Sequence, residues 1–363
     1  MPTKTDSETD IHLIHIGSPK TSTTSLQVHL AEVWKNDEHP IFPIGMMNNK
    51  GPFSVTDKIH QLITHDIAMR DIQWRAGFDE LKNHINQIVA EKPKNRRLLI
   101  SSELISQTLA GPACLKTRFT RLRDLFGPNC EIVLTIREQK KAIESYYSTL
   151  VRAFGLSIPY DYFLFYSSEF PNWDKNPIPS FDFWGIYKEA LSVFDKVTVL
   201  IFEELISSKE NVTRSHGLFR SLFKIDFSSL QQVNEGLSID KAHYLASFNS
   251  MLKNGFSEAA ETPNLNIYAG PDRQIIKRAA KTPPLSMELS RIKDVKTSTI
   301  RQGKIFNNSL KYAELAKSFD LVNGLDEDEM KALETRISNF FRPGNNNLSQ
   351  ALGVDLNRYG YAV

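Results

Sequence analysis

The sequence predicts an α/β fold in which helices cover both faces of a parallel sheet. Four short aliphatic runs, each rich in β-branched residues or leucine, have the length of buried strands: 11–16, 97–101, 131–136 and 197–202. Segments with helical spacing of apolar residues lie between them. Strands that alternate with helices of ten or more residues are typical of a parallel sheet. We therefore expect a three-layer α/β fold with helical insertions and a C-terminal helical cap.

Each helix is predicted from an apolar stripe. Leu26, Leu30 and Val33 form the stripe of the first helix, and Leu81 and Ile85 belong to the second piece of a helical pair. The predicted helices lie at 24–34, 57–92 in two pieces, 115–126, 140–152, near 210–223, 239–253 and 327–341. The last is expected to end at Arg342-Pro343-Gly344, because proline and glycine usually stop a helix.

Length and composition suggest how these elements are organised into domains. The 363 residues contain 41% hydrophobic and 24% charged residues, which is globular composition. Residues 1–10 are polar and mixed in charge, and we expect them to be a disordered N-terminus. Residues 11–363 are expected to form a single domain, whose C-terminal helical part covers about 255–363.

Charge and cysteine content exclude several classes of protein. Lysine and arginine number 44 against 42 acidic residues, so no overall basic field indicates nucleic-acid binding. The sequence has no secretory signal and no run of 18 apolar residues, so we expect no transmembrane segment. Cys114 and Cys130 are too few for a disulfide framework. These features predict a cytoplasmic protein.

The segment Gly17-Ser18-Pro19-Lys20-Thr21-Ser22-Thr23-Thr24-Ser25 has the features of a phosphate-binding loop. It lies between a buried strand and a helix, where backbone N–H groups and the positive helix end attract anions. Lys20 adds a charge, and the four hydroxyl residues from Thr21 to Thr24 add donors. The loop is not a Walker A motif, because its lysine follows the only glycine by three residues. A hydroxyl-rich helix cap is the alternative.

The pattern Ile14-His15-Ile16-Gly17-x-x-Lys20-Thr21-x-Thr23-Thr24-Ser25-Leu26-Gln27 resembles the 5′-phosphosulfate loop of sulfotransferases, especially bacterial carbohydrate-type members. Those enzymes resemble P-loop kinases in fold and use 3′-phosphoadenosine 5′-phosphosulfate (PAPS) as the donor. The resemblance implies that Ser18, Pro19, Lys20, Thr21, Ser22, Thr23 and Thr24 bind the donor. The family commonly has glycine where this chain has Ser22. If that position required a positive φ, serine there would be strained.

A second match concerns the donor's 3′-phosphate. In the family, a strand-end arginine and a helical serine eight residues later bind this group, and Arg137 and Ser145 have that spacing. Arginine grips a phosphate in a fork, and a serine two turns along the next helix can point the same way. Taken alone, the pair also fits a surface arginine and a serine on a helix face.

Weaker similarities extend along the chain. Glu203-Glu204-Leu205 is similar to an acidic turn after a late strand of the family, and 233–238 is similar to a segment of bacterial members. The C-terminal region from Arg342 to Tyr361 is similar to their ending. We expect these three segments to be structural. The aromatic-rich segment 154–173 could bind sugar or acyl groups, but core packing is the favoured interpretation.

Sulfuryl transfer requires a group that stabilises the leaving phosphate and a base that accepts the acceptor's proton. We assign the first role to Lys20 and the second to Glu103, which follows the strand 97–101 at the carboxyl edge of the sheet. In cytosolic members of the family, a catalytic histidine stands at the end of the equivalent strand. Ser101 and Ser102 are possible substrate contacts. Glu103 could instead be a helix-start carboxylate, and His39, His60 and His65 are alternative bases.

These residues together predict a PAPS-dependent sulfotransferase. It would sulfate an acceptor hydroxyl, releasing adenosine 3′,5′-bisphosphate without a metal. A carbohydrate or glycolipid acceptor is favoured, and a phenol, an amine or a small alcohol remains open. A small-molecule or nucleoside kinase and a non-catalytic nucleotide-binding module are the alternatives. The kinase is disfavoured by the missing Walker A spacing, and the module by the intact Lys20, Arg137 and Ser145.

Overall fold

The computed structural model describes residues 11–18, 21–33, 39–44, 59, 61–62, 65–107, 111–154, 156, 158–169, 177–207, 213–230, 239, 242, 245–246 and 327–363. The chain forms two compact units. The first comprises residues 1–142, 172–234 and 338–363, and the second comprises 143–171 and 235–337.

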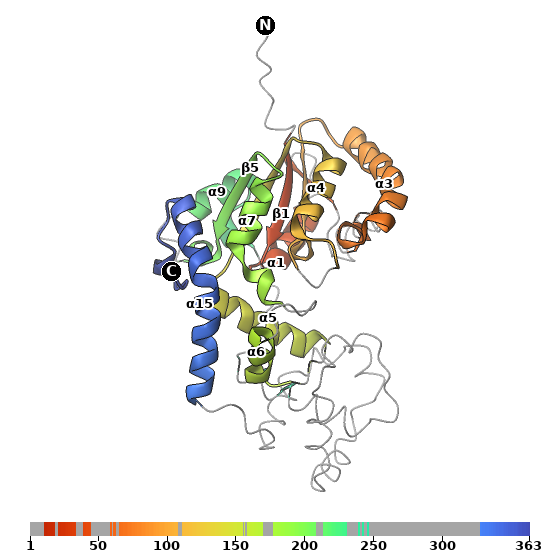
Figure 1. Cartoon of the computed structure of the whole chain (residues 1–363). Helices are drawn as coiled ribbons and strands as arrows, with labels where there is room; N and C mark the ends of the chain where they lie inside the picture. Colours follow the sequence, from red (N-terminus) through yellow and green to blue (C-terminus); the bar gives the residue numbers. More distant parts are fainter. Residues whose placement is uncertain are drawn as a thin grey trace, which may run out of the picture. The chain divides into compact units, whose positions relative to one another are not determined.

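The first unit is built on a five-stranded parallel sheet, which confirms the predicted α/β fold (Figure 1). Its strands lie in the order β2-β3-β1-β4-β5. Their bounds are β1 His12–Gly17, β2 Ile41–Ile44, β3 Arg97–Ser101, β4 Cys130–Ile136 and β5 Lys196–Ile201. The central strand β1 pairs with β4 over its whole length, from His12 opposite Cys130 to Gly17 opposite Thr135.

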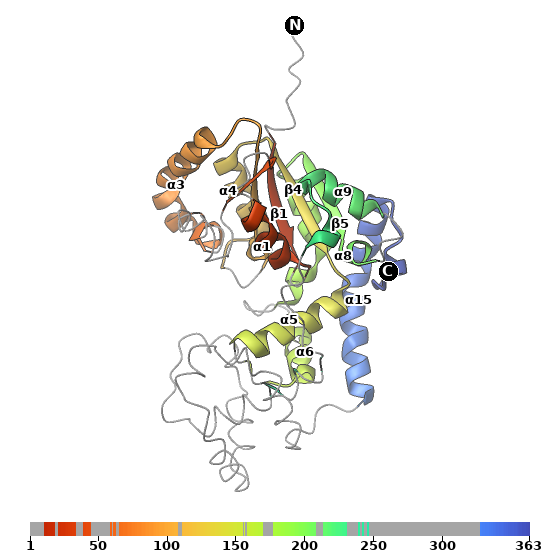
Figure 2. The same cartoon turned by 180° about the vertical axis from the view of Figure 1, so that it is seen from behind.

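Helices cover both faces of this sheet. On one face lie α1 (Thr23–Val33), α8 (Phe202–Leu205) and α9 (Arg214–Phe223). On the other lie α4 (Leu115–Phe126) and α7 (Phe183–Leu191), with α3 (Asp71–Glu91) packed beside α4 (Figures 1 and 2). The α1 and α9 face buries a continuous core, and each large apolar side chain in it contributes about 1.5–3 kcal/mol. Its residues include Leu13, Leu26, Leu30, Leu99, Val133, Leu200, Phe219 and Phe223.

Strand β2 is a difference from the sequence prediction, which contained only four strands. It is short, and Pro43 stands opposite Leu99 of β3. Proline cannot donate a hydrogen bond to a neighbouring strand, so it argues against a strand in the middle of a sheet. At the edge only one side of the strand is paired. Pro43 is therefore compatible with this position.

The C-terminal helix also differs from prediction. Helix α15 spans Glu327–Leu352 and continues through Pro343 and Gly344, where we expected it to end. A proline inside a helix removes one backbone hydrogen bond and strains the turn before it. Tertiary packing beyond Pro343 outweighs this cost. Asn345 is buried and exchanges two hydrogen bonds with Gln139, at 2.7 and 3.2 Å, and Leu348 is fully buried.

The C-terminal segment is hydrogen-bonded to the turn after β5. The short helix η10 (Leu356–Tyr359) follows α15, and the Tyr359 hydroxyl donates to Glu204 Oε1 at 2.6 Å. The Tyr361 hydroxyl donates to Glu203 Oε2 at 3.1 Å. These bonds give the acidic turn and the C-terminal region a structural contact. The third similar segment, 233–238, lies outside the described residues.

The second unit contains residues 143–154 of α5 (Gln139–Phe154) and α6 (Tyr160–Glu169). Tyr147 packs against Tyr160 and Phe163, with ring centroids 5.1 and 5.4 Å apart. The Tyr147 hydroxyl donates to the carbonyl of Ile158 at 2.8 Å. Core packing is therefore confirmed for Tyr160 and Phe163.

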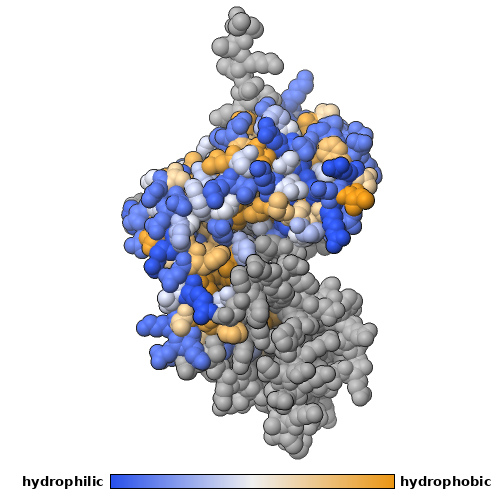
Figure 3. Space-filling view, viewed as in Figure 1, coloured by the Kyte–Doolittle hydropathy of each residue, from blue (hydrophilic) through white to orange (hydrophobic). Residues whose placement is uncertain are grey.

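The described surface is mixed in polarity. Figure 3 shows hydrophilic residues interspersed with smaller apolar areas over the coloured part of that face. Ile72, Ile206 and Phe340 are the most exposed of the large apolar side chains that the structure describes. In the same residues, no helix is both long and apolar enough to cross a membrane.

Candidate functional site at the carboxyl edge of the sheet

The strand order creates a switch point between β1 and β4. After β1 the chain passes through α1 to β2 on one side of the sheet, whereas after β4 it continues to β5 on the other. In open α/β sheets, ligands bind outside the carboxyl ends of the strands where the connections diverge in this way. The predicted phosphate loop follows β1, and Arg137 directly follows β4. Both therefore lie at the edge where a ligand site is expected.

Hydrogen bonds fold the loop after β1 tightly onto β4. The Ser18 N–H donates to the carbonyl of Thr135 at 2.9 Å. The N–H and hydroxyl of Thr21 both donate to the carbonyl of Ser18, at 3.2 and 2.7 Å. A Cβ atom at Gly17 would lie only 1.8 Å from Thr23 Oγ1. Only glycine lets the first turn of α1 approach the strand end this closely.

Ser18 has the features of a ligand contact. Its side chain is 3% exposed, and its Oγ has no hydrogen-bond partner among the described residues. A buried hydroxyl without a partner costs about 1–3 kcal/mol. A bound anion would supply an acceptor for it. Pro19 and Lys20, the next two residues of the predicted donor site, lie outside the described residues.

Ser22 adopts the left-handed conformation, with φ of +61°. The positive φ that would strain serine at this position is therefore present. For a residue with a Cβ, this conformation costs about 1–2 kcal/mol. Strain of this kind often occurs at ligand-binding sites, where the surrounding structure enforces it.

Helix α1 begins directly after this strained residue. Its first N–H groups have no partner within the helix, because an α-helix leaves its first four donors unpaired. Thr23 is buried at the first turn, and Thr24 is exposed. Among the predicted donor-binding residues, Ser18, Thr21, Ser22 and Thr23 thus gather at one helix start.

A row of buried polar groups supports the strand ends beneath the loop. His15 Nδ1 lies 2.9 Å from Ser101 Oγ of β3, and His15 Nε2 lies 2.9 Å from Thr135 Oγ1 of β4. Burial lowers the pKa of His15 to about 3, so the ring is neutral and joins three strands. His15 therefore supports the strand ends beneath the loop. Ser101 is fully buried in this row, and its hydroxyl is bonded to His15.

Arg137 leaves the end of β4 and stacks on an aromatic ring. Its guanidinium carbon lies 5.2 Å from the ring centroid of Phe202, the first residue of α8. Stacking of this kind holds the planar fork in a defined orientation. Ser145 lies on α5, as predicted, in the part of that helix that belongs to the second unit.

Glu103 directly follows the edge at which β3 ends. It is the first residue of the 3-10 helix η4 (Glu103–Ile105), and Ser102 Oγ caps this helix by accepting the N–H of Leu104. Glu103 is half-buried. The structure therefore confirms that Glu103 lies at the carboxyl edge and that it begins a short helix.

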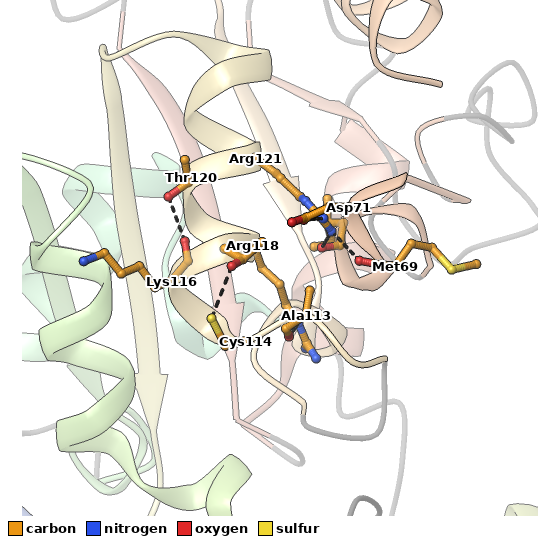
Figure 4. A network of polar contacts seen from close by, with 10 residues as sticks. Met69, Asp71, Ala113, Cys114, Lys116, Arg118, Thr120 and Arg121 are labelled. Atoms are coloured by element: carbon orange, nitrogen blue, oxygen red, sulfur yellow. Dashed lines mark hydrogen bonds and ion pairs between the residues drawn. The ribbon is translucent and has the colours of Figure 1, made fainter. Parts of the chain in front are cut away.

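Two arginines of α4 hold neighbouring segments of the chain by hydrogen bonds (Figure 4). Arg118 donates to the carbonyls of Ala113 and Gly111, each at 2.8 Å, and also to those of Ile105 and Gln107. Arg121 donates to the carbonyl of Met69 at 2.7 Å and to Asp71 Oδ1 at 2.6 Å. Burial lowers the pKa of Arg118 to about 10. Because Arg118 binds the carbonyls of Ile105 and Gln107, it fixes the segment that directly follows Glu103.

The alternative bases differ in position. His39 precedes β2 and lies at the amino edge of the parallel sheet, whereas the loop, Glu103 and Arg137 follow the carboxyl ends. Burial lowers the pKa of His39, whose Nδ1 accepts the N–H of Ile41. The side chain of His65 is 55% exposed and lies beside Asp66. His60 is outside the described residues. The position of His39 at the opposite edge from the loop and Arg137 argues against it as the base.

Comparison with known proteins identified no relative: no family model, curated protein or solved structure matches the chain. In the parts of the chain that the structure describes, no three His, Cys, Asp or Glu side chains are grouped to hold a metal ion. The interpretation of the site therefore depends on its own geometry.

The sequence interpretation missed the supporting polar row. Ser101 and Thr135 were not recognised as partners of His15, although each of the three residues stands near the carboxyl end of a predicted strand. Polar residues at corresponding places in neighbouring strands are the signal that could have revealed the row. Their pairing required the strand order, which the sequence did not predict.

Replacing Ser22 by glycine should stabilise the protein. We expect Ser22→Gly to raise the free energy of unfolding by about 1 kcal/mol, because glycine adopts a positive φ without strain. Urea denaturation measures the change. Ser25→Gly is the matched control within α1, where glycine should instead destabilise by about 1 kcal/mol. A Ser22→Gly variant that is less stable than the wild type would contradict the inference that Ser22 is strained.

Burial of neutral His15 should make stability depend on pH. The folded pKa of about 3 lies below the ordinary value of 6.5, so this contribution is complete above pH 6.5 and is lost as the pH falls towards 3. Relative to His15→Gln, the wild type should lose about 1.4 kcal/mol per pH unit in this window. Urea unfolding at several pH values measures the difference. The exposed His65→Gln control should retain the wild-type dependence of unfolding free energy on pH. The same dependence in all three proteins would refute the inference that His15 is buried in its neutral form.

Proposed function

We propose that the chain is a sulfotransferase that moves the sulfuryl group of PAPS to an acceptor hydroxyl. The observation that carries this proposal is the placement at one switch point of two elements that are suited to bind anions. The hydroxyl-rich loop follows β1, Arg137 follows β4, and the bond from Ser18 N–H to the carbonyl of Thr135 ties the two strand ends together. A nucleotide donor with phosphates at two positions requires two such elements.

The loop is suited to the donor's 5′-phosphate. Ser18 offers a buried hydroxyl without a partner among the described residues, and the first turn of α1 offers backbone donors. In the proposal, Thr21, Ser22, Thr23 and Thr24 surround the same group, together with Pro19 and Lys20. Arg137 and Ser145 bind the 3′-phosphate.

The reaction consists of one displacement at sulfur. PAPS supplies the sulfuryl group. The acceptor oxygen forms a bond to sulfur while the bond from sulfur to the 5′-phosphate oxygen breaks. Glu103 takes the proton that the acceptor hydroxyl loses, and Lys20 neutralises the charge on the departing phosphate.

The proposed acceptor is a carbohydrate or glycolipid hydroxyl. The support is the resemblance of the first loop and of the C-terminal region to bacterial carbohydrate-type sulfotransferases. Of the aromatic segment after α5, Tyr160 and Phe163 are committed to packing, whereas Phe165 is 38% exposed. This exposed ring is the described part of the segment that can contact a sugar.

Calorimetric titration with adenosine 3′,5′-bisphosphate tests the donor. Arg137→Ala should weaken binding by about 30- to 1000-fold, because a half-buried guanidinium that grips a phosphate is removed. Arg220→Ala removes an exposed arginine of α9 and should leave the affinity unchanged. A preference for ATP with magnesium over the bisphosphate would favour a kinase and overturn the proposal. Tight bisphosphate binding without sulfuryl transfer to any acceptor would favour the non-catalytic module.

The candidate base is tested by Glu103→Gln. We expect kcat to fall by about 10²- to 10⁴-fold while bisphosphate affinity is retained, because glutamine cannot accept the acceptor's proton. Transfer of labelled sulfate from PAPS to glycans, glycolipids and phenols identifies an acceptor for the measurement. His60→Gln and His65→Gln are the comparison variants. If one of them loses activity and Glu103→Gln does not, that histidine is the base.

A further inference from the structure

The surroundings of Arg137 include a carboxyl group that the proposed chemistry does not use. Phe202, on which the guanidinium stacks, is followed in α8 by Glu203. Glu203 and Arg137 interact electrostatically, and the positive charge of Arg137 favours the ionised form of the carboxyl. A carboxyl group thus follows directly after the ring on which Arg137 stacks.

Two donors from different parts of the first unit hold the Glu203 carboxyl in place. The N–H of Glu138, the residue after Arg137, donates to Oε1 at 2.9 Å. The hydroxyl of Tyr361, close to the chain end, donates to Oε2 at 3.1 Å. The carboxyl is thus fixed from both sides, and one of the two donors belongs to the C-terminal segment.

The other acidic groups nearby have different partners. Glu138 accepts the N–H groups of Lys140 and Lys141 at the start of α5, at 2.7 and 2.9 Å. Glu204 accepts from Ser215 and from Tyr359. The groups that act on the Glu203 carboxyl are accordingly the N–H of Glu138, its own backbone N–H, the Tyr361 hydroxyl and the charge of Arg137.

We propose that Glu203 is the internal counter-charge of Arg137: its carboxylate neutralises the guanidinium when no anion is bound, and it takes up a proton from solvent when an anion binds there. The inference rests on the proposed function, because it takes Arg137 as the anion-binding group. Glu203 and Tyr361 are then positioning residues, and they make anion affinity depend on pH.

The direction of this dependence follows from charge. An anion beside Arg137 repels the Glu203 carboxylate and favours its protonated form. By linkage, the affinity for the anion rises as the pH falls through the pKa of Glu203. Burial already raises this pKa above its ordinary value, although the N–H of Glu138, the Tyr361 hydroxyl and the charge of Arg137 oppose the shift.

Calorimetric titration of the full chain with inorganic sulfate tests the proposal. Sulfate keeps a constant charge between about pH 8 and pH 5.5, so it adds no proton of its own. Near pH 8, Glu203→Gln should bind sulfate about tenfold more tightly than the wild type if the anion shifts the carboxyl by one pKa unit. This advantage should shrink as the pH falls, because the wild-type carboxyl then takes up its proton.

Two further variants separate this role from a structural one. Tyr361→Phe removes a donor to the carboxylate, so the wild-type pH dependence should move to higher pH. Glu204→Gln changes the neighbouring glutamate and should retain the wild-type pH dependence. Thermal melting confirms that each variant is folded.

The other possible results of the sulfate titrations also decide whether Glu203 has the proposed role. A constant ratio between wild type and Glu203→Gln across the pH range would overturn the proposal. So would sulfate binding that Arg137→Ala leaves unchanged, or no sulfate binding at all. If sulfate binds with the expected pH dependence but adenosine 3′,5′-bisphosphate does not bind, the proposed function fails and the role of Glu203 stands.

Discussion

The close approach of helix α1 to the end of β1 is the constraint on which the site depends. Thr23 Oγ1 occupies the space that a side chain at residue 17 would need, so the strand must end in glycine. The chain then turns within a few residues, and Ser22 takes a conformation that serine adopts at a cost. In return, the positive end of the helix and the hydroxyls of Ser18 and Thr21 are brought to one place. The tightness of this turn and the strain in it have the same cause.

The two edges of the sheet use buried polar groups in different ways. At the carboxyl edge, neutral hydroxyls and a neutral His15 satisfy one another without placing a charge beneath the loop. At the amino edge, Glu131 is buried between Arg97 and Lys196, with N–O distances of 3.5 and 2.9 Å. A carboxylate beneath the loop would oppose an anion there. The neutral row supports the strand ends and places no negative charge beneath the positive helix start.

The sequence predicted the elements whose local signals agree with their packing. Strand β3 and helix α4 were predicted with the bounds that the structure has, because their apolar patterns and ends are unambiguous. Pro43 is the reason that the sequence did not predict β2. Pro343 is the reason that the predicted C-terminal helix ended before the observed one. In both cases tertiary context, a sheet edge or a buried Asn345, overrides the local preference. The loop was recognised from its residue types, whereas the row through His15 required the strand order.

The C-terminal segment links the end of the chain to the strand ends at which the site lies. Asn345 bonds to Gln139 at the start of α5, and Tyr361 bonds to Glu203 beside Arg137. In the proposal, the Glu203 carboxyl balances the charge of Arg137 and takes up a proton when an anion binds, so it needs a defined position beside the arginine. Two donors fix the carboxyl more firmly than one. The Tyr361 hydroxyl therefore helps to hold this carboxyl in place beside the proposed anion site.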